Sequence, residues 1–156
     1  MATTNATIAL SSDITDSTVS ASNTSTLWTA GTTTGLNTMT SVTKVLSSTD
    51  HVDLITTGSV STTHAYVYIN NPSTDHTEYF HIHIGNAVGS GTYDDGTLPT
   101  EEIGRLYGGD WMFIPWSQTD TAASIEIAAT NWTSSTGDIP VEYALFHEDT
   151  DYLTNA

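Results

Sequence analysis

Positively charged residues are almost missing from this chain of 156 residues, which contains a single lysine, Lys44, and a single arginine, Arg105. Eighteen Asp and Glu residues oppose them, so the formal net charge is −16. Nucleic-acid-binding proteins need cationic side chains to replace the counterions of phosphate groups, and anionic membrane surfaces attract the same side chains. We therefore expect neither nucleic acid nor a membrane as a partner.

Cysteine is absent, which excludes disulfides, thiolate zinc sites and a cysteine nucleophile. No apolar run approaches the ~20 residues of a membrane span, and residues 1–20 lack the basic start and apolar stretch of a signal peptide. We therefore expect synthesis and folding in a cytoplasm. The sequence also lacks the Gly-x-Ser-x-Gly, P-loop and dinucleotide-binding patterns, so we expect no enzymatic activity and no cofactor.

Threonine and serine are abundant, with 48 residues of which 31 are Thr, and Thr suits a half-buried strand surface. No window combines helical periodicity with helix caps, whereas short alternating segments are frequent. Eight to ten short strands separated by Asn-Pro, Asp-Gly and Gly-Gly-Asp turns favour a sandwich, jelly roll or small barrel. We predict an all-β fold, an antiparallel β-sandwich or jelly roll. The strands are expected at 7–10, 25–28, 39–46, 51–56, 65–70, 77–84, 103–107, 111–115, 124–129 and 141–147.

The composition changes near Thr63. Residues 1–63 contain 30 of the 48 Ser and Thr residues but only four of the acids. Residues 64–156 contain the other fourteen acids and all aromatic residues except Trp28. We therefore predict a Thr/Ser-rich N-terminal arm or set of edge strands in residues 1–63, and a sandwich or jelly-roll core in residues 64–156.

Two adjacent strands, 65–70 and 77–84, are predicted to form an antiparallel hairpin in which Val67 pairs with Phe80 and Ala65 with Ile82. The other face of this hairpin would carry Tyr66, Tyr68, Tyr79, His64, His81 and His83. Three imidazoles on one face are candidate ligands for a metal ion. The alternative, which we prefer, is an outer strand surface or a face buried against another subunit, where the histidines could sense pH.

Two other patterns suggest metal chemistry. The His81–His83 pair followed by a Gly-Asp turn and Ile114-Pro115 is similar to the cupins, but residues 85–88 contain no carboxylate and no His follows Pro115. A cupin-like metal-binding protein thus remains only a remote alternative. Clustered carboxylates can bind calcium, but neither acidic cluster has EF-hand spacing, so we expect solvated loops. The clusters are Asp94, Asp95, Glu101 and Glu102, and Glu148, Asp149 and Asp151.

The large aromatic residues can stack on sugars or be buried at an interface. Trp111 and Phe113 share one face of their predicted strand, and the apolar Met112 and Ile114 share the other, which favours a central strand or a subunit contact. We take six residues as interface candidates: Tyr66, Tyr68, Tyr79, Trp111, Phe113 and Trp116.

The order of strands and turns in residues 64–148 resembles small virion structural proteins of tailed bacteriophages, especially those of cyanobacterial and marine hosts. The segments that carry the resemblance are Tyr66-Val67-Tyr68-Ile69-Asn70-Asn71, the His-rich strand, the stretch from Leu106 to Trp116, Ser124–Ala129 and Val141–Phe146. Such proteins are described as head decoration, cement or fibre components with a β-sandwich or jelly roll, and the family has no catalytic residues to assign here.

The resemblance implies a non-enzymatic protein of the outer capsid surface, made in the host cytoplasm. Its partners would be the major capsid protein or other virion subunits, and it would form a homo-oligomer such as a trimer. The N-terminal arm would add strands to neighbouring subunits. The alternative is a receptor- or carbohydrate-binding fibre or tail module, for which exposed aromatic residues around a cleft are expected.

Overall fold

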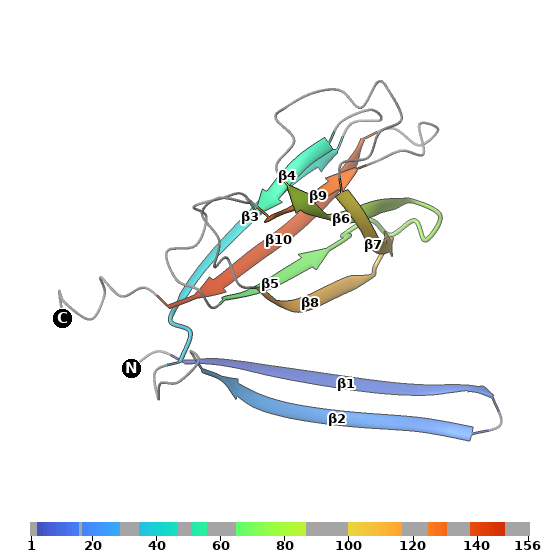
Figure 1. The fold of residues 1–156 in the computed structure, drawn as a ribbon. Coiled ribbons are helices and arrows are strands. Elements are labelled where there is room, and N and C mark those ends of the chain that lie inside the picture. Colours follow the sequence, from blue (N-terminus) through green and yellow to red (C-terminus); the bar gives the residue numbers. More distant parts are fainter. Residues whose placement is uncertain are drawn as a thin grey trace.

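The computed structural model describes residues 3–15, 17–28, 35–46, 51–55, 65–86, 100–116, 125–130 and 138–148. These ranges form ten strands and no helix, which confirms the predicted all-β fold with antiparallel sheets (Figure 1). No helix in these ranges is therefore long and apolar enough to cross a membrane. The strands are β1 (Thr4–Thr15), β2 (Ser17–Leu27), β3 (Thr38–Leu46), β4 (His51–Ile55), β5 (Ala65–Asn70), β6 (Tyr79–Asn86), β7 (Thr100–Tyr107), β8 (Trp111–Trp116), β9 (Ile125–Thr130) and β10 (Ile139–His147).

Eight of these strands form two four-stranded antiparallel sheets. The first sheet has the order β3-β10-β5-β8, and the second has the order β4-β9-β6-β7. Counted from β3, the first strand pairs with the last, the second with the seventh, the third with the sixth and the fourth with the fifth. This pairing is the strand order of a jelly roll, in which a long hairpin is rolled up into a sandwich.

The hydrophobic core lies between the two sheets and follows the two-residue alternation of the strands. Ala65, Val67 and Ile69 of β5 are fully buried, while the residues between them are only partly buried. Phe80 and Ile82 of β6 are fully buried on the facing sheet. In β5 the alternation therefore predicts correctly which side faces the core, whereas in β6 His81 and His83 on the other side are buried as well.

The predicted hairpin between residues 65–70 and 77–84 is wrong. β5 pairs with β10 and β8, whereas β6 pairs with β7 and β9 in the other sheet. The connection of residues 71–78 crosses from one sheet to the other instead of forming a hairpin turn. The apolar faces of β5 and β6 therefore meet across the core, and their polar faces point to opposite sides of the molecule.

β3 and β4 are the edge strands at one side of the two sheets, and both contribute to the core through Leu46, Leu54 and Ile55. Lys44 of β3 links the two sheets at this side, because its Nζ donates a hydrogen bond to the carbonyl oxygen of Asp53 on β4. Residues 38–55 thus belong to the jelly roll. Of the described N-terminal segments, the β1–β2 hairpin lies outside it.

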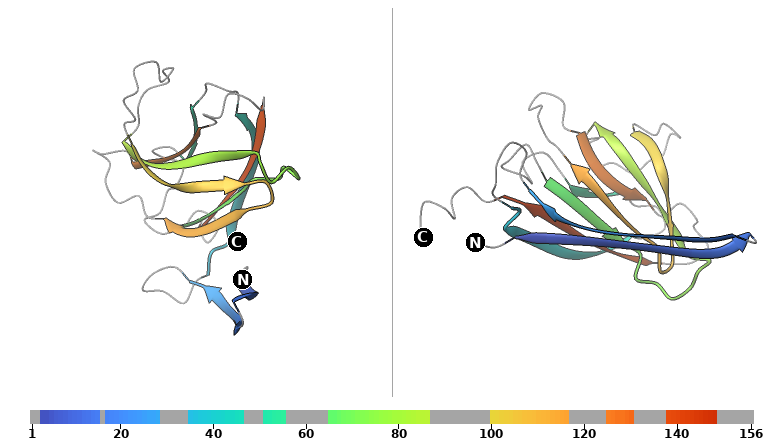
Figure 2. Two further views of the ribbon diagram at one scale, coloured as in Figure 1. Left: turned by 90° about the vertical axis from the view of Figure 1, so that its right-hand side faces the viewer. Right: turned by 90° about the horizontal axis from the view of Figure 1, so that it is seen from below.

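The β1–β2 hairpin is a two-stranded sheet of its own, with Thr4 opposite Leu27 and Leu10 opposite Ala21. Its base is attached to the jelly roll, since Leu27 is buried and the Thr4 hydroxyl donates to the carbonyl oxygen of Leu36 at 2.8 Å. The hairpin runs along the sandwich on the side of β8 (Figure 1), and its far end extends past the sandwich (Figure 2).

Two connections pack together around the buried side chain of Asn71 at one end of the sandwich. The Asn71 Nδ2 donates to the carbonyl oxygen of Leu106 at 3.0 Å, and its Oδ1 accepts from the Ser73 amide at 3.1 Å. The backbone amide of Gly108 donates to the carbonyl oxygen of Glu78 at 2.9 Å. These bonds hold the 71–78 connection against the turn at 108–110, and a buried amide that meets its hydrogen-bonding needs stabilises both.

Candidate functional site: an aromatic face opposite the hairpin

The outward side of the first sheet carries a group of aromatic side chains from three adjacent strands. Tyr66 and Tyr68 come from β5, Trp111 and Phe113 from β8, and Phe146 from β10. The strand register places Tyr68 opposite Phe113, and Tyr66 opposite Phe146. We call these five residues the aromatic face.

The rings of the aromatic face contact one another. Tyr66 stacks on Phe113 with centroids 5.2 Å apart and planes within 9°. Phe113 meets Phe146 edge to face at 6.0 Å, and Tyr68 lies 6.2 Å from Trp111. Such pairs between neighbouring strands stabilise a sheet and restrict the rings to one arrangement. Trp111 keeps 49% of its surface exposed, so the face offers a rigid apolar surface at the edge strand β8.

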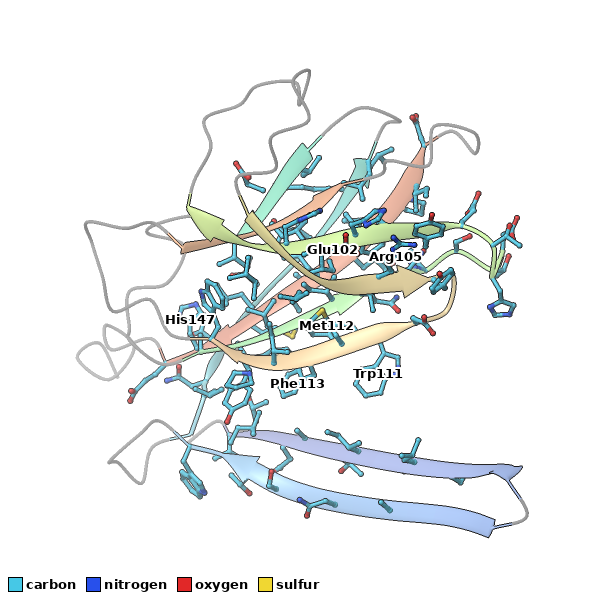
Figure 3. All side chains as sticks on the ribbon, turned by 45° about the vertical axis from the view of Figure 1, so that its right-hand side comes forward. Glu102, Arg105, Trp111, Met112, Phe113 and His147 are labelled. Carbon is cyan, nitrogen blue, oxygen red and sulfur yellow. The ribbon has the colours of Figure 1, made fainter. Side chains whose placement is uncertain are left out.

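A hollow of about 260 Å³ separates the aromatic face from the hairpin. Residues 4–8 of β1 form one wall, and Tyr68, Trp111, Phe113 and Phe146 form the other. In Figure 3, Trp111 and Phe113 point from β8 toward the hairpin, while Met112 lies on the opposite side of the strand. The expectation of a central strand is therefore wrong, because β8 is an edge strand with one face in the sandwich and the other on this hollow.

This side of the molecule carries little charge. Among the outward-facing positions of the described first sheet, Glu142 is the one charged residue, and its Oε2 accepts a hydrogen bond from Asn70 Nδ2 at 3.0 Å. Residues 3–28 contain Asp13 and Asp16 and no Lys or Arg. In a chain with eighteen carboxylates, the hairpin and the aromatic face thus form a nearly uncharged side.

The outward side of the second sheet carries a different, polar group. His81 Nδ1 lies 3.1 Å from Glu102 Oε2, and Arg105 Nε donates to Glu102 Oε1 at 3.3 Å. The guanidinium group of Arg105 also lies 5.1 Å from the ring centroid of Tyr79. A bulge in β7 explains the grouping: Gly104 pairs with Ile82 but Glu102 pairs with His83, so the extra residue puts Glu102 and Arg105 on one side.

The structure separates the residues that the predicted hairpin would have brought together. His81, His83 and Tyr79 lie on the second sheet, whereas Tyr66 and Tyr68 lie on the first. His81 and His83 are 6% and 1% exposed, so they do not form an open outer surface. His64 lies outside the described residues. Among the residues that the structure describes, no group of three His, Asp or Glu side chains is placed to hold a metal ion.

The remaining candidates are the interface residue Trp116 and the residues of the two acidic clusters. Trp116 is buried in the core, and Glu148 is buried and not on a solvated loop. Glu102 lies in a strand and not in an acidic loop. The side chains of the other acidic-cluster residues lie outside the described part of the chain, and these residues are Asp94, Asp95, Glu101, Asp149 and Asp151.

Substitution of Glu102 tests whether the ion pairs of the polar group stabilise the folded protein. Desolvation raises the pKa of Glu102, but the hydrogen bond and charge of His81, followed by those of Arg105, outweigh it and lower the pKa below its usual value. Because a depressed carboxyl pKa stabilises the folded state above the pKa of the unfolded chain, this contribution is lost as the pH falls through the folded pKa. Glu102→Gln should therefore lower the free energy of unfolding at neutral pH by less than about 1 kcal/mol, a value typical of partly exposed pairs.

The measurement is urea unfolding of both proteins between about pH 7 and pH 3, on either side of the ordinary carboxyl pKa. The difference should shrink toward the acid end. The exposed Asp138→Asn serves as the control and should show a smaller difference. An effect of Glu102→Gln that is the same at every pH would contradict the ion-pair explanation.

No family model matches the chain, and no curated protein matches its sequence. The interpretation of the site therefore depends on its own geometry. Of the two groups, the polar one satisfies its charges internally through the contacts of Glu102 with His81 and Arg105, whereas the aromatic face and the hairpin leave apolar surface open. An exposed apolar surface of this kind marks a binding site for another molecule.

Proposed function

We propose that this protein is a non-enzymatic structural protein of a tailed-bacteriophage virion that decorates or cements the outer capsid surface. The observation that carries the proposal is the β1–β2 hairpin, whose strands of 12 and 11 residues lie outside the jelly roll. A projecting hairpin with exposed apolar residues is suited to attach a compact domain to neighbouring subunits by adding strands to their sheets. The strand order of residues 64–148 also resembles proteins with this role.

The charge distribution supports a position on the outside of the capsid. Both cations are engaged within the chain, Lys44 with the Asp53 carbonyl and Arg105 with Glu102 and Tyr79. No cation of the described surface is therefore left to bind the phosphates of a packaged genome, and the net charge of −16 would repel them. The partners would be the major capsid protein or other virion subunits.

The test is electron microscopy of the intact particle that carries this chain. We expect density for the jelly roll on the outer capsid surface, with the hairpin in contact with the underlying or adjacent subunits. Particles assembled with a chain that lacks residues 1–34 should lose this density. Density on the inner capsid wall, or full occupancy without the hairpin, would overturn the proposal.

A second candidate is a receptor- or carbohydrate-binding module of a fibre or tail. It is favoured by the four aromatic rings around the hollow, since sugars stack on such rings while their hydroxyl groups bind polar side chains. An array of neutral glycans measures this function directly. A glycan that binds the protein, with affinity lost in Trp111→Ala, would favour this candidate.

A further inference from the structure

The exposed apolar residues of this protein gather on one side. Eight large hydrophobic side chains are exposed among the described residues. Six of them belong to the hairpin, its base or the outward side of the first sheet, and these are Ile8, Leu10, Trp28, Met39, Val45 and Trp111. Single exposed apolar residues are normal, but a contiguous group marks a surface that another molecule covers.

The hairpin has an apolar side that faces the aromatic face of its own chain across the hollow and is only partly covered by it. Side chains alternate along β1, so Ala6, Ile8 and Leu10 share one side, while Asn5 and Thr7 share the other. On the second side Thr7 and Thr26 form hydrogen bonds across the hairpin, to Thr24 and Asn5 respectively. On the apolar side Ile8 and Leu10 remain 50% and 56% exposed.

The hairpin is too extended to be stable alone. Its base is fixed by the buried Leu27 and by the hydrogen bond from Thr4 to the Leu36 carbonyl oxygen, but a hollow lies between the following residues and the aromatic face. Its far end reaches past the sandwich, where no sheet formed by the described residues lies beneath it (Figure 2). Since an isolated two-stranded hairpin is at best marginally stable in water, a third element should cover it.

Charge favours a second copy of this chain as that element. Two copies with a net charge of −16 repel each other at most approaches, and the nearly uncharged side formed by the hairpin and the aromatic face is where the repulsion is smallest. The chain also supplies both halves of an apolar contact, the side with Ile8 and Leu10 and the face with Trp111 and Phe113. Exchange of one element between identical copies is a common route to oligomers.

We infer that the apolar side of each hairpin lies on the aromatic face of a neighbouring copy. A contact between two different surfaces of the same chain forms a ring where the rotation between copies closes, an open filament where it does not, or a pair in which both hairpins are exchanged. The inference uses the proposed function only in treating the chain as an assembly subunit. It names the partner of the aromatic face, which the proposed function leaves open.

The first test is the mass of the purified full-length protein, measured by light scattering over a wide range of concentration. We expect an oligomer. Leu10→Asp on the hairpin and Trp111→Asp on the aromatic face should each raise the dissociation constant at least tenfold, roughly the effect of losing one buried apolar side chain. The matched control is Thr24→Asp, which adds the same charge to the polar side of the hairpin, away from the hollow, and should leave the mass unchanged.

A mixing experiment tests which surfaces meet. Leu10→Asp retains an intact aromatic face, and Trp111→Asp retains an intact hairpin, so an equimolar mixture of the two should form one-to-one complexes that neither variant forms alone. A hairpin-to-hairpin or face-to-face contact would give no such complex. Thermal unfolding of each variant checks that the jelly roll is intact, and a hairpin substitution should leave its midpoint within about 2 °C, as expected for a surface change.

The outcomes separate the inference from the proposed function. A wild-type chain that is monomeric at all concentrations, or a mixture without complexes, would overturn the inference. A monomer that still decorates capsids would overturn the inference and leave the proposed function in place. An oligomer that fails to bind any capsid would support the inference and contradict the proposed function.

Discussion

Removal of residues 1–60 is expected to leave a chain that does not fold, whereas removal of residues 1–34 should leave a folded jelly roll. The longer deletion removes β3 and β4, together with the core residues Leu46, Leu54 and Ile55. Each such side chain contributes about 1.5–3 kcal/mol through its burial, and the sum is comparable to the 5–15 kcal/mol that typically separates folded from unfolded states. The deletion also exposes the long edges of β10 and β9.

The shorter deletion removes only the hairpin and the segment that follows it. It ends at residue 34, so that Leu36, which is fully buried, is kept. Far-UV circular dichroism and calorimetry should show a cooperative unfolding transition for the shorter deletion and none for the longer one. A cooperative transition in the longer deletion would mean that residues 61–156 form a complete fold without β3 and β4.

Gly108→Ala is expected to destabilise the jelly roll by about 1–3 kcal/mol or more, the range for forcing extra volume into a packed site. A Cβ atom at this position would lie 2.3 Å from the carbonyl oxygen of Asp75 and 2.9 Å from that of Ser73. Both are backbone atoms and cannot rotate away. The clash would separate the turn at 108–110 from the 71–78 connection and disturb the hydrogen bonds of the buried Asn71.

Gly104→Ala is the matched control, because no atom lies within 4 Å of a Cβ placed there. Gly104 borders a hollow beside Ile82 and Met112, so a methyl group fits. Alanine also loses less conformational freedom on folding, and the variant should be unchanged or more stable by up to about 1 kcal/mol. Denaturant unfolding measures both variants. Equal effects at the two positions would show that the contact between the two connections adds little.

Most strands could be predicted from the sequence, but their partners could not. Alternation in residues 65–70 and 79–84 reports which side of a strand is apolar and faces the core, and that side is the same in a hairpin and in a sandwich. It contains no information on which strand lies alongside. In a jelly roll the neighbours are far apart in the sequence, as β3 and β10 are, so local pattern favours a hairpin that the chain does not form.

The candidate site was predictable only in part. The side shared by Trp111 and Phe113, and that shared by Tyr66 and Tyr68, follow from alternation within one strand. These two pairs contact each other only because β5 pairs with β8. They lie beside Phe146 only because β5 also pairs with β10. The bulge that brings Glu102 to His81 leaves no clear signal in the sequence, because it depends on one extra residue in β7.

The pairing of β3 with β10 determines when this protein can fold. Thr38 lies opposite His147, and Leu46 lies opposite Ile139, so the two strands that join are the first and the last of the jelly roll. The first sheet therefore cannot be completed until the ribosome has released residue 147, and contacts of such long range make folding slow. The strands of the β1–β2 hairpin pair locally and are synthesised before the jelly roll. A nascent chain thus presents its apolar hairpin before its own jelly roll exists.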